Sequence, residues 1–354
     1  MAAIVATPGP LEQIGKLKGP QFGSKGVACL ATDGVKIYAG CRDHAIRVYD
    51  AQTHKLLYAL GAPAGPLDVA REGHVGCVTC LKLCGRRLFS GGGDRTLRAW
   101  DLKDRGPLRK VGEHGAIVTA LAVAGATLCS ADADGFVGLW DLETLEVAGE
   151  LEAKPSIYAL AVVGPVLFAA RGDGETVVAW DVSTKARADA PPYAAESLLA
   201  VGKKLYLGRD DGSISVWDAA RATPLPAAAL EHGHDGCVTA LASMAGVVVS
   251  GGEDGAVVCW DAAARTRRWA TRPREGAVNG ADAIVADDSG CLFSASPMAP
   301  HVQVWRRAEP GARGPPAPES SSELEPEDSD ARLLAELEVN RRKELLARNR
   351  RGVS

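Results

Sequence analysis

Short runs of alternating apolar and polar residues recur along the chain, and each run ends at a turn rich in glycine and aspartate. One such series covers residues 78–83, 87–90 and 97–100. Alternation with a period of two over four to eight residues is typical of β-strands. Turns such as Asp134-Gly135 and Asp254-Gly255 suit tight hairpins, because glycine tolerates a positive φ and aspartate can bond to its own backbone. The pattern therefore predicts many short antiparallel strands.

The strand pattern repeats with a period of about 40 residues, within the range of known repeat architectures. Five Trp-Asp pairs follow one another at spacings of 40, 40, 37 and 43 residues, at positions 100–101, 140–141, 180–181, 217–218 and 260–261. Tyr49-Asp50 precedes this series and Trp305 follows it, so there are seven units. A four-stranded unit cannot cover both of its own faces. Neighbouring units must therefore stack, and a ring of them removes most exposed edges.

Three of the seven units align without a gap. Each has a histidine, a serine, an aspartate and a tryptophan separated by 16, 4 and 6 residues, and the three sets are His74, Ser90, Asp94 and Trp100; His114, Ser130, Asp134 and Trp140; and His234, Ser250, Asp254 and Trp260. Over residues 11–307 the chain resembles the WD-repeat family. The resemblance implies an all-β fold, a seven-bladed β-propeller of four-stranded antiparallel blades.

The resemblance also implies a role for the four aligned residues. In the family the aspartate accepts from the histidine, the histidine meets the serine hydroxyl, and the serine reaches the indole N–H. Serine, histidine and aspartate are also hydrolase residues, but three copies in one chain favour a structural network over an active site. We therefore expect no catalytic residue. Because the other blades lack parts of the set, blades two, three and six should be the stiffest.

The domain organisation follows from where the repeat begins and ends. We expect an N-terminal extension over residues 1–10, the propeller over 11–307, a Pro-, Ser- and acid-rich flexible linker over 308–330, and a short charged helix over 331–354. Residues 11–18 read as a strand that completes blade seven from the N-terminal side, as in the family. The terminal helix could be a solvated, partly formed helix, a partner-docking or coiled-coil helix, or a basic segment for nuclear import or nucleic-acid contact.

Composition limits the functional class. The formal net charge of -4 and a pI near 6.0 argue against attraction of the whole domain to nucleic acid. We find no secretory signal and no run of apolar residues long enough for a membrane span, so we expect no membrane association. The nine scattered cysteines indicate reduced thiols, as expected in the cytosol or nucleus, and we expect a cytoplasmic location with the nucleus as the alternative.

No cofactor or metal is expected. The three glycines at 91–93 precede an aspartate in a hairpin turn rather than a helix with a lysine, so they are not a phosphate loop. The close spacing of Cys77, Cys80 and Cys84 resembles that of half a zinc site. However, residues three apart on a strand point to opposite faces, and no second pair follows at finger spacing.

These observations predict a non-catalytic scaffold that presents one propeller face to protein partners. In the family the turn with the aspartate and the loop with the histidine open on the same face. The residues beside the aspartate should line it, namely Arg42, His44, Arg95, Arg171, Arg209, Asp210 and Glu253. Arginine is enriched at binding hot spots. Our hypothesis is that the four arginines form a discontinuous basic rim for an acidic segment of a partner.

An alternative function rests on a short match in blade two. Residues 88–103 resemble the box by which some WD-repeat proteins dock on the adaptor of cullin-RING ubiquitin ligases, and the matching positions are Asp94, Trp100, Asp101 and Lys103. Most of this box is ordinary blade sequence. The basic residue carries the distinction, because blade three has Glu143 at that position. This match makes a substrate receptor of such a ligase the alternative prediction.

Overall fold

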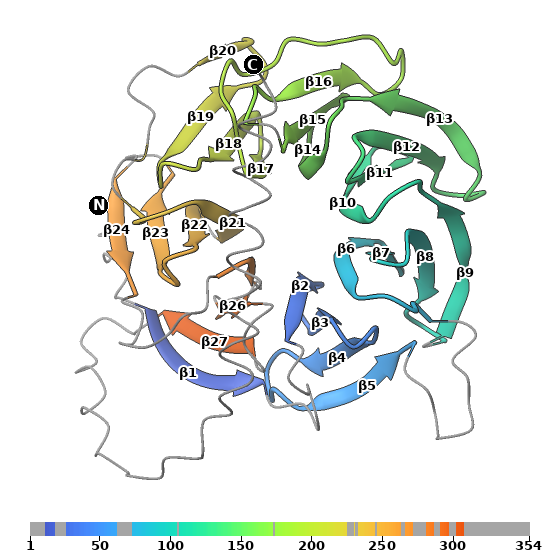
Figure 1. Cartoon of the computed structure of the whole chain (residues 1–354). Coiled ribbons are helices and arrows are strands. Elements are labelled where there is room, and N and C mark those ends of the chain that lie inside the picture. The colour runs from blue at the N-terminus through green and yellow to red at the C-terminus, as the bar shows by residue number, and fades with distance from the viewer. Residues whose placement is uncertain are drawn as a thin grey trace, which may run out of the picture. The chain divides into compact units, whose positions relative to one another are not determined.

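The computed structural model describes residues 11–17, 26–61, 73–104, 106–172, 174–224, 230, 233–244, 246–262, 266–271, 281–286, 291–296 and 302–307. These residues form seven antiparallel sheets, and no helix occurs among them. The sheets stand around a ring as blades (Figure 1), which confirms the predicted all-β, seven-bladed propeller. The predicted N-terminal extension, linker and C-terminal helix lie outside the described residues.

In each blade the chain passes from the centre of the ring outward. The innermost strands, which start at the ring centre in Figure 1, are β2 (Val27–Thr32), β6 (Val78–Cys84), β10 (Val118–Ala124), β14 (Ile157–Val163), β17 (Ser197–Val201), β21 (Val238–Met244) and β25 (Ala283–Ala286). The second strands are β3 (Lys36–Cys41), β7 (Arg87–Gly92), β11 (Thr127–Asp132), β15 (Val166–Arg171), β18 (Lys204–Gly208), β22 (Val247–Gly252) and β26 (Cys291–Ala295).

The third and fourth strands complete the blades toward the rim. The third strands are β4 (Ile46–Asp50), β8 (Thr96–Asp101), β12 (Phe136–Asp141), β16 (Val178–Asp181), β19 (Ile214–Asp218), β23 (Val257–Asp261) and β27 (Val302–Arg307). The outer strands are β5 (Leu56–Leu60), β9 (Gly106–Glu113), β13 (Val147–Glu152), β20 (Thr223–Pro224), β24 (Arg267–Ala270) and β1 (Leu11–Leu17).

The ring is closed by the first strand of the chain. Strand β1 pairs antiparallel with β27, with Leu17 opposite Val302 and Gln13 opposite Trp305. Leu17 and Val302 are fully buried and share one apolar cluster with Val27 of blade one. The predicted strand over 11–18 is therefore confirmed, and it joins the two ends of the repeat.

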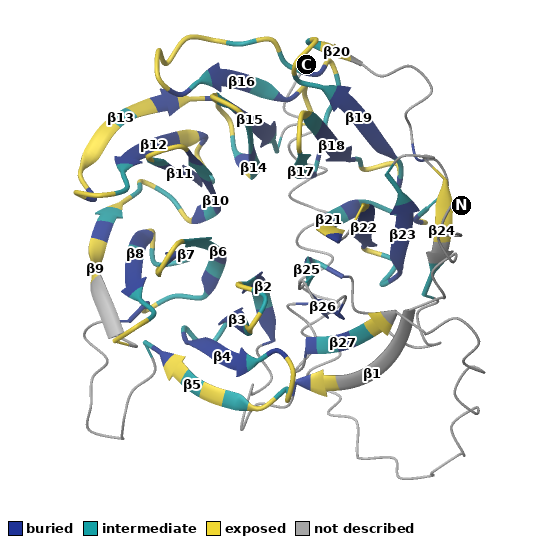
Figure 2. Ribbon diagram, turned by 180° about the vertical axis from the view of Figure 1, so that it is seen from behind, coloured by how far each residue is buried: buried dark blue, intermediate teal, exposed yellow. Residues whose placement is uncertain are grey.

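The core consists of seven apolar clusters, and each is shared by two neighbouring blades. Between blades one and two, for example, Tyr38 and Ile46 pack with Leu88 and Trp100. The buried positions of Figure 2 accordingly run through every blade, while the outer strands are largely exposed. Burying one large apolar side chain contributes roughly 1.5–3 kcal/mol, so each blade depends on both of its neighbours.

Blade four departs from the four-stranded pattern. Its sheet has three strands, β14, β15 and β16. The outer position is taken by isolated bridges, in which Arg187 pairs with Trp180 and Ala194 with Thr176. Pro191 and Pro192 lie in the segment between these bridges. Proline cannot donate a ladder hydrogen bond, so this segment does not form a regular strand.

Removing residues 1–17 should lower the melting temperature by several degrees, because it deletes β1 and exposes the cluster around Leu17. Removing residues 311–354 should leave it nearly unchanged, because the repeat pattern ends before that segment. Differential scanning fluorimetry of the two truncations and the full chain measures both values. Equal melting temperatures for all three would contradict the closure by β1.

Candidate functional site

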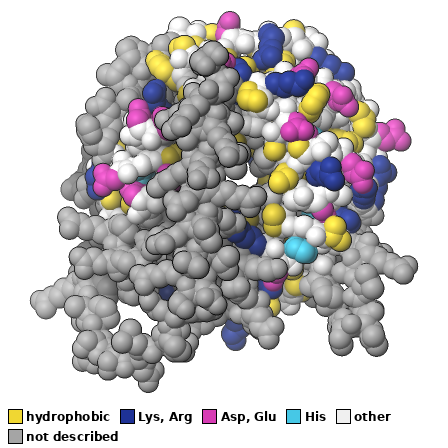
Figure 3. Space-filling view, in the orientation of Figure 1, with side chains coloured by type: hydrophobic (Ala, Val, Ile, Leu, Met, Phe, Trp, Pro, Cys, Tyr) yellow, Lys and Arg dark blue, Asp and Glu magenta, His cyan; other side chains and the backbone are white. Residues whose placement is uncertain are grey.

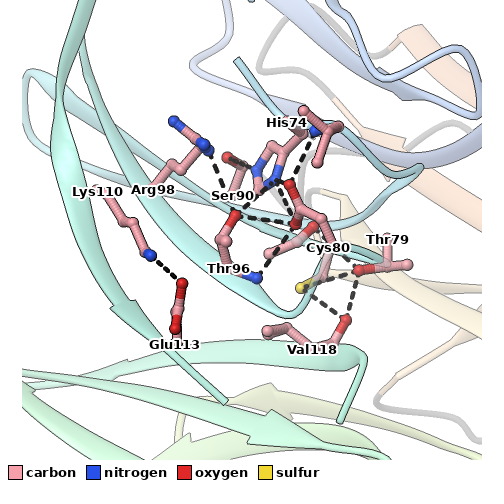
Figure 4. A network of polar contacts seen from close by, with 12 residues as sticks. His74, Thr79, Cys80, Ser90, Thr96, Arg98, Lys110, Glu113 and Val118 are labelled. Carbon is pink, nitrogen blue, oxygen red and sulfur yellow. Dashed lines mark hydrogen bonds and ion pairs between the residues drawn. The ribbon is translucent and has the colours of Figure 1, made fainter. Parts of the chain in front are cut away.

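The aligned polar residues of blade two form one continuous network (Figure 4). His74 Nδ1 lies 3.0 Å from Asp94 Oδ1, His74 Nε2 lies 2.7 Å from Ser90 Oγ, and the Trp100 indole donates to Ser90 Oγ over 2.8 Å. A carboxylate can only accept, so Nδ1 carries the proton and Nε2 accepts from the serine hydroxyl. The network therefore ties the loop before β6 to the second and third strands.

The turn aspartate of this network is stabilised in its ionised form. Burial opposes ionisation of Asp94, but the hydrogen bonds that its carboxylate accepts from His74 and from the backbone N–H of Val75 outweigh burial and hold its pKa well below the usual range. The pKa of Asp254 is lowered by the same balance with His234. Each carboxylate thus acts as a fixed acceptor at the end of its blade.

The same arrangement recurs in blade six. His234 contacts Asp254 Oδ1 at 3.1 Å and Ser250 Oγ at 2.7 Å, and Trp260 donates to Ser250 over 2.8 Å. The serines of all three networks, Ser90, Ser130 and Ser250, have no exposed surface. A buried hydroxyl that is occupied on both sides cannot reach a substrate. The networks therefore stabilise the blades, and they offer no nucleophile.

In blade three the aspartate that contacts the histidine differs from the one predicted. His114 and Trp140 meet Ser130 as expected, at 2.7 Å each, but His114 Nδ1 contacts Asp132 Oδ2 at 3.1 Å rather than Asp134. Asp132 also accepts the backbone N–H of Phe136. The expectation for Asp134 was wrong because fixed spacing cannot distinguish two aspartates in one turn.

Glycine at the equivalent position of blades two and six explains the exchange. A Cβ placed on Gly92 would lie 2.6 Å from both Asp94 Oδ1 and His74 Nδ1. A Cβ on Gly252 would meet Asp254 and His234 in the same way. A side chain at this position therefore enters the space of the turn carboxylate, and Asp132 fills that space with its own carboxylate.

In other blades different residues replace members of the network, or a member is missing. In blade one Asp43 pairs with Arg47, with Nη1 to Oδ1 at 2.9 Å, while in blade seven Trp305 donates to Ser294 over 2.8 Å. In blade five the serine position holds Leu207, and the buried Trp217 indole N–H has no hydrogen-bond partner among the described residues. Asp173, near the turn-aspartate position of blade four, and Ala299, at that position in blade seven, lie outside the described residues. Arg47 and Ser294 were missed because they stand at other spacings.

In blades two to five the aspartate of the Trp-Asp pair caps the following turn. Asp101 Oδ1 accepts the backbone N–H groups of Lys103 and Asp104 at 2.7 and 3.2 Å. Asp50, Asp141, Asp181 and Asp218 make the same contacts in their own turns. In the proposed ligase box, therefore, Asp94, Trp100 and Asp101 serve the blade. Lys103 is the exposed member.

The residues beside the turn aspartates lie at one end of the blades. In blades one to four and six the turn donates a backbone hydrogen bond to the segment that leads into the innermost strand of its own blade, as in Arg42 N to Gly26 O, Gly93 N to Cys77 O, Gly172 N to Ser156 O and Glu253 N to Cys237 O. We call this end the turn face. Its predicted members differ in exposure: Arg95, Asp210 and Glu253 are exposed, and Arg42, His44, Arg171 and Arg209 are partly buried.

Two of the four predicted rim arginines are held by acidic neighbours. Arg171 pairs with Glu175 at 3.0 Å, and Arg209 Nε lies 3.3 Å from Asp211 Oδ2. Arg95 donates to a backbone carbonyl, that of Gly115, at 3.3 Å. Because Arg95 is exposed, its charge is the one most available on this face.

Sequence reasoning missed the apolar members of the turn face. Val75, Ile117 and Tyr158 are 74%, 44% and 40% exposed, and they belong to blades two, three and four. Tyr158 stands where blades two, three and six have Thr79, Thr119 and Thr239, whose hydroxyls donate to carbonyls of the second strand. Its longer side chain reaches Gly172 O at 3.3 Å. The exchange of a repeated threonine for tyrosine was the signal that could have revealed it.

Metal binding has no support among the described residues. No group of three or more His, Cys, Asp or Glu side chains within the described ranges could hold a metal ion. Cys77, Cys80 and Cys84 are free thiols, and burial raises the pKa of Cys80 to about 12. A thiol held in its protonated form is a poor metal ligand. Within the described part of the chain there is also no helix long and apolar enough to cross a membrane.

Comparison with known proteins agrees with this geometry. The WD40 family model, described as "WD domain, G-beta repeat", matches residues 67–101 and 228–261, in blades two and six. The chain is a WD-repeat β-propeller. Two solved structures share the fold of this propeller. The structure of U3-55K superposes with a TM-score of 0.68 and 18% sequence identity, and the match covers 84% of this chain and 99% of the U3-55K chain. The computationally designed Ika8 protein has a TM-score of 0.61 and 23% identity, with coverage of 82% and 99%.

Curated relatives match parts of the propeller. Small ribosomal subunit protein RACK1y of Oryza sativa subsp. japonica is 27% identical over 178 residues, which are 45% of this chain and 52% of that protein. Angio-associated migratory cell protein of Homo sapiens is 26% identical over 196 residues, 52% of this chain and 45% of that protein. The chain thus spans about half the length of these relatives.

Blade three offers a matched test of the network. Asp132→Ala should destabilise the fold by about 1–3 kcal/mol, because it leaves the buried His114 N–H without an acceptor. Asp134→Ala, two residues away in the same turn, should cost clearly less. Urea denaturation followed by tryptophan fluorescence gives both values, with Asp94→Ala and Asp254→Ala as references. A larger loss for Asp134→Ala than for Asp132→Ala would refute the assignment.

The tryptophans provide a second test. Trp100→Phe should cost about 1 kcal/mol more than Trp217→Phe, since the first removes an indole hydrogen bond to Ser90 and the second removes an N–H that has no partner. Both changes lose similar apolar area, so the difference isolates the hydrogen bond. The midpoints of chemical denaturation measured by circular dichroism report it. Equal losses would show that the Ser90 bond adds nothing.

Proposed function

We propose that this WD-repeat propeller is a non-catalytic scaffold that binds protein partners through the turn face of blades two to four. WD40 propellers are generally protein-interaction scaffolds rather than enzymes. The observation that supports the site is the combination of exposed Val75, Ile117 and Tyr158 with exposed Arg95 at one end of adjacent blades. Tyrosine and arginine are enriched at binding hot spots, and the apolar side chains add area that a partner can bury.

The chemistry of this face favours a particular partner. Exposed Arg95 supplies a planar fork for a carboxylate, and Lys154 lies over the Phe136 ring of blade three at 5.5 Å from its centre. Figure 3 shows apolar side chains interspersed with charged ones on the described part of one face. A segment with acidic and apolar residues in alternation would match such a surface. We therefore propose a protein partner that contains such a segment.

Two double variants test the face. The first, Arg95→Glu with Ile117→Asp, alters the turn face. The control pair, Arg86→Glu with Val35→Asp, alters exposed residues in turns at the opposite end of the blades. Arg86 belongs to blade two, and Val35, which is 66% exposed, belongs to blade one. In affinity purification with mass spectrometry from the source cells, the first pair should lose the main partners at least about tenfold, the loss that about 1.4 kcal/mol of binding free energy produces. The control pair should keep them. Both should keep the wild-type circular dichroism spectrum.

The same purification distinguishes the alternative function, a ubiquitin-ligase receptor, from binding at the turn face. Cullin and adaptor peptides that disappear with Lys103→Ala and persist in the face variant would favour the ubiquitin-ligase receptor. Partners retained in full by the face variant would contradict the proposed site. Loss of partners in the control pair alone would place binding at the opposite end of the blades.

A further inference from the structure

Blades two and three carry opposite charge to an unusual degree. Residues 73–113 of blade two contain nine Lys and Arg and four Asp and Glu, a net charge of +5. Residues 114–153 of blade three contain no Lys or Arg and seven Asp and Glu, a net charge of -7. The whole chain has a formal charge of -4. The other blades are close to balanced, so the contrast belongs to this neighbouring pair.

The contrast extends to the rim of the ring. Strands β9 and β13 are the outer strands of the two blades and lie next to each other along the rim (Figures 1 and 2). Lys110 is opposite Arg98 in its sheet, and Glu150 is opposite Gly138. Because Arg98 and Gly138 are both two residues before the blade tryptophan, Lys110 and Glu150 occupy equivalent positions. One outer strand is therefore basic at the position where its neighbour is acidic.

The charged side chains of this rim are available to solvent. Lys103, Arg109 and Lys110 are exposed in blade two, and Glu143, Glu146, Glu150 and Glu152 are exposed in blade three. Some have neighbours within the chain: Lys110 pairs with Glu113, Glu152 with Lys154 at 2.7 Å, and Arg109 donates to Leu145 O at 3.0 Å. Exposed pairs of this kind are worth little and exchange readily for other partners.

The backbone edge of β13 is already partly covered. Lys185 Nζ donates to Ala148 O at 2.9 Å, and Arg187 Nη2 donates to Glu152 O at 3.1 Å. These contacts from blade four occupy carbonyls that an added strand would need. A partner at this rim must therefore be recognised by side-chain charge rather than by strand addition.

We propose that the rim of blades two and three is a self-complementary surface for a second copy of this chain. A two-fold axis that runs parallel to the central axis of the ring, at the rim between β9 and β13, places the basic strand of each copy against the acidic strand of the other. Both strands run from the aspartate-capped turn to the turn face, and this axis keeps that direction, so the start of β9, near Lys103, lies opposite the start of β13, near Glu143. Lys110 and Glu150 lie near the middle of their strands and face each other. Such an interface is closed and gives dimers.

This proposal is independent of the partner site on the turn face, because it uses the rim. Its first test is the mass of the full chain by light scattering after gel filtration. At micromolar concentration and about 0.1 M salt, where the Debye length is about 10 Å, we expect twice the monomer mass of 36.8 kDa. At about 1 M salt the Debye length is about 3 Å, and the dissociation constant should rise about tenfold or more.

Charge exchange provides the decisive test. Lys103→Glu with Lys110→Glu makes both strands acidic, and Glu143→Lys with Glu150→Lys makes both strands basic, so each double variant should be monomeric. An equimolar mixture of the two should form a heterodimer, and the quadruple variant should dimerise as the wild type does. Circular dichroism shows that each variant is folded, which limits any loss to the interface.

Three results would overturn the proposal. The first is a wild-type chain that stays monomeric at about 0.1 M salt, where charges within about 10 Å of each other are only weakly screened. The second is a dimer whose dissociation constant neither double variant changes, which would place the interface elsewhere. The third is an equimolar mixture that stays monomeric, which would mean that the charges do not face each other.

Discussion

The burial of apolar side chains between neighbouring blades is the constraint on which the rest of this molecule depends. A single sheet of four short strands has two faces and cannot cover either by itself. Each of the seven clusters is shared by two blades, so no blade is stable without both neighbours. That requirement makes the pairing of β1 with β27 necessary, because it completes the blade that joins the two ends of the ring.

The polar networks act within the frame that these clusters set. A buried donor or acceptor without a partner costs about 1–3 kcal/mol, so a histidine inside a blade needs both the serine and an aspartate. The carboxylate can come from either of two backbone positions, as Asp94 and Asp132 show. The carboxylate therefore occupies the same place beside the histidine in both blades, although it comes from different backbone positions. Blade one meets the need differently, with the pair of Arg47 and Asp43.

Because the interior is occupied in this way, interaction with other molecules falls to the ends of the blades and to the rim. The two surfaces differ in character. The turn face combines arginine with exposed Val75, Ile117 and Tyr158, which suits a partner that buries apolar area. The rim of blades two and three offers opposite charges on matching strands, beside an exposed apolar side chain, Val147. Electrostatic contacts of this kind favour specificity and rapid association over tight binding.

The sequence by itself determined the number of blades, their strands and the closing strand, since the spacing of Trp-Asp pairs and the alternation of apolar residues are local properties of the chain. It also located the networks of blades two and six. It could not choose between Asp132 and Asp134, nor identify Arg47, Ser294 or Tyr158 as members of their sites. Those choices depend on which side chains share a small buried volume or reach the same face. Such proximity is decided when strands distant in sequence are brought together, so only the tertiary structure could settle it.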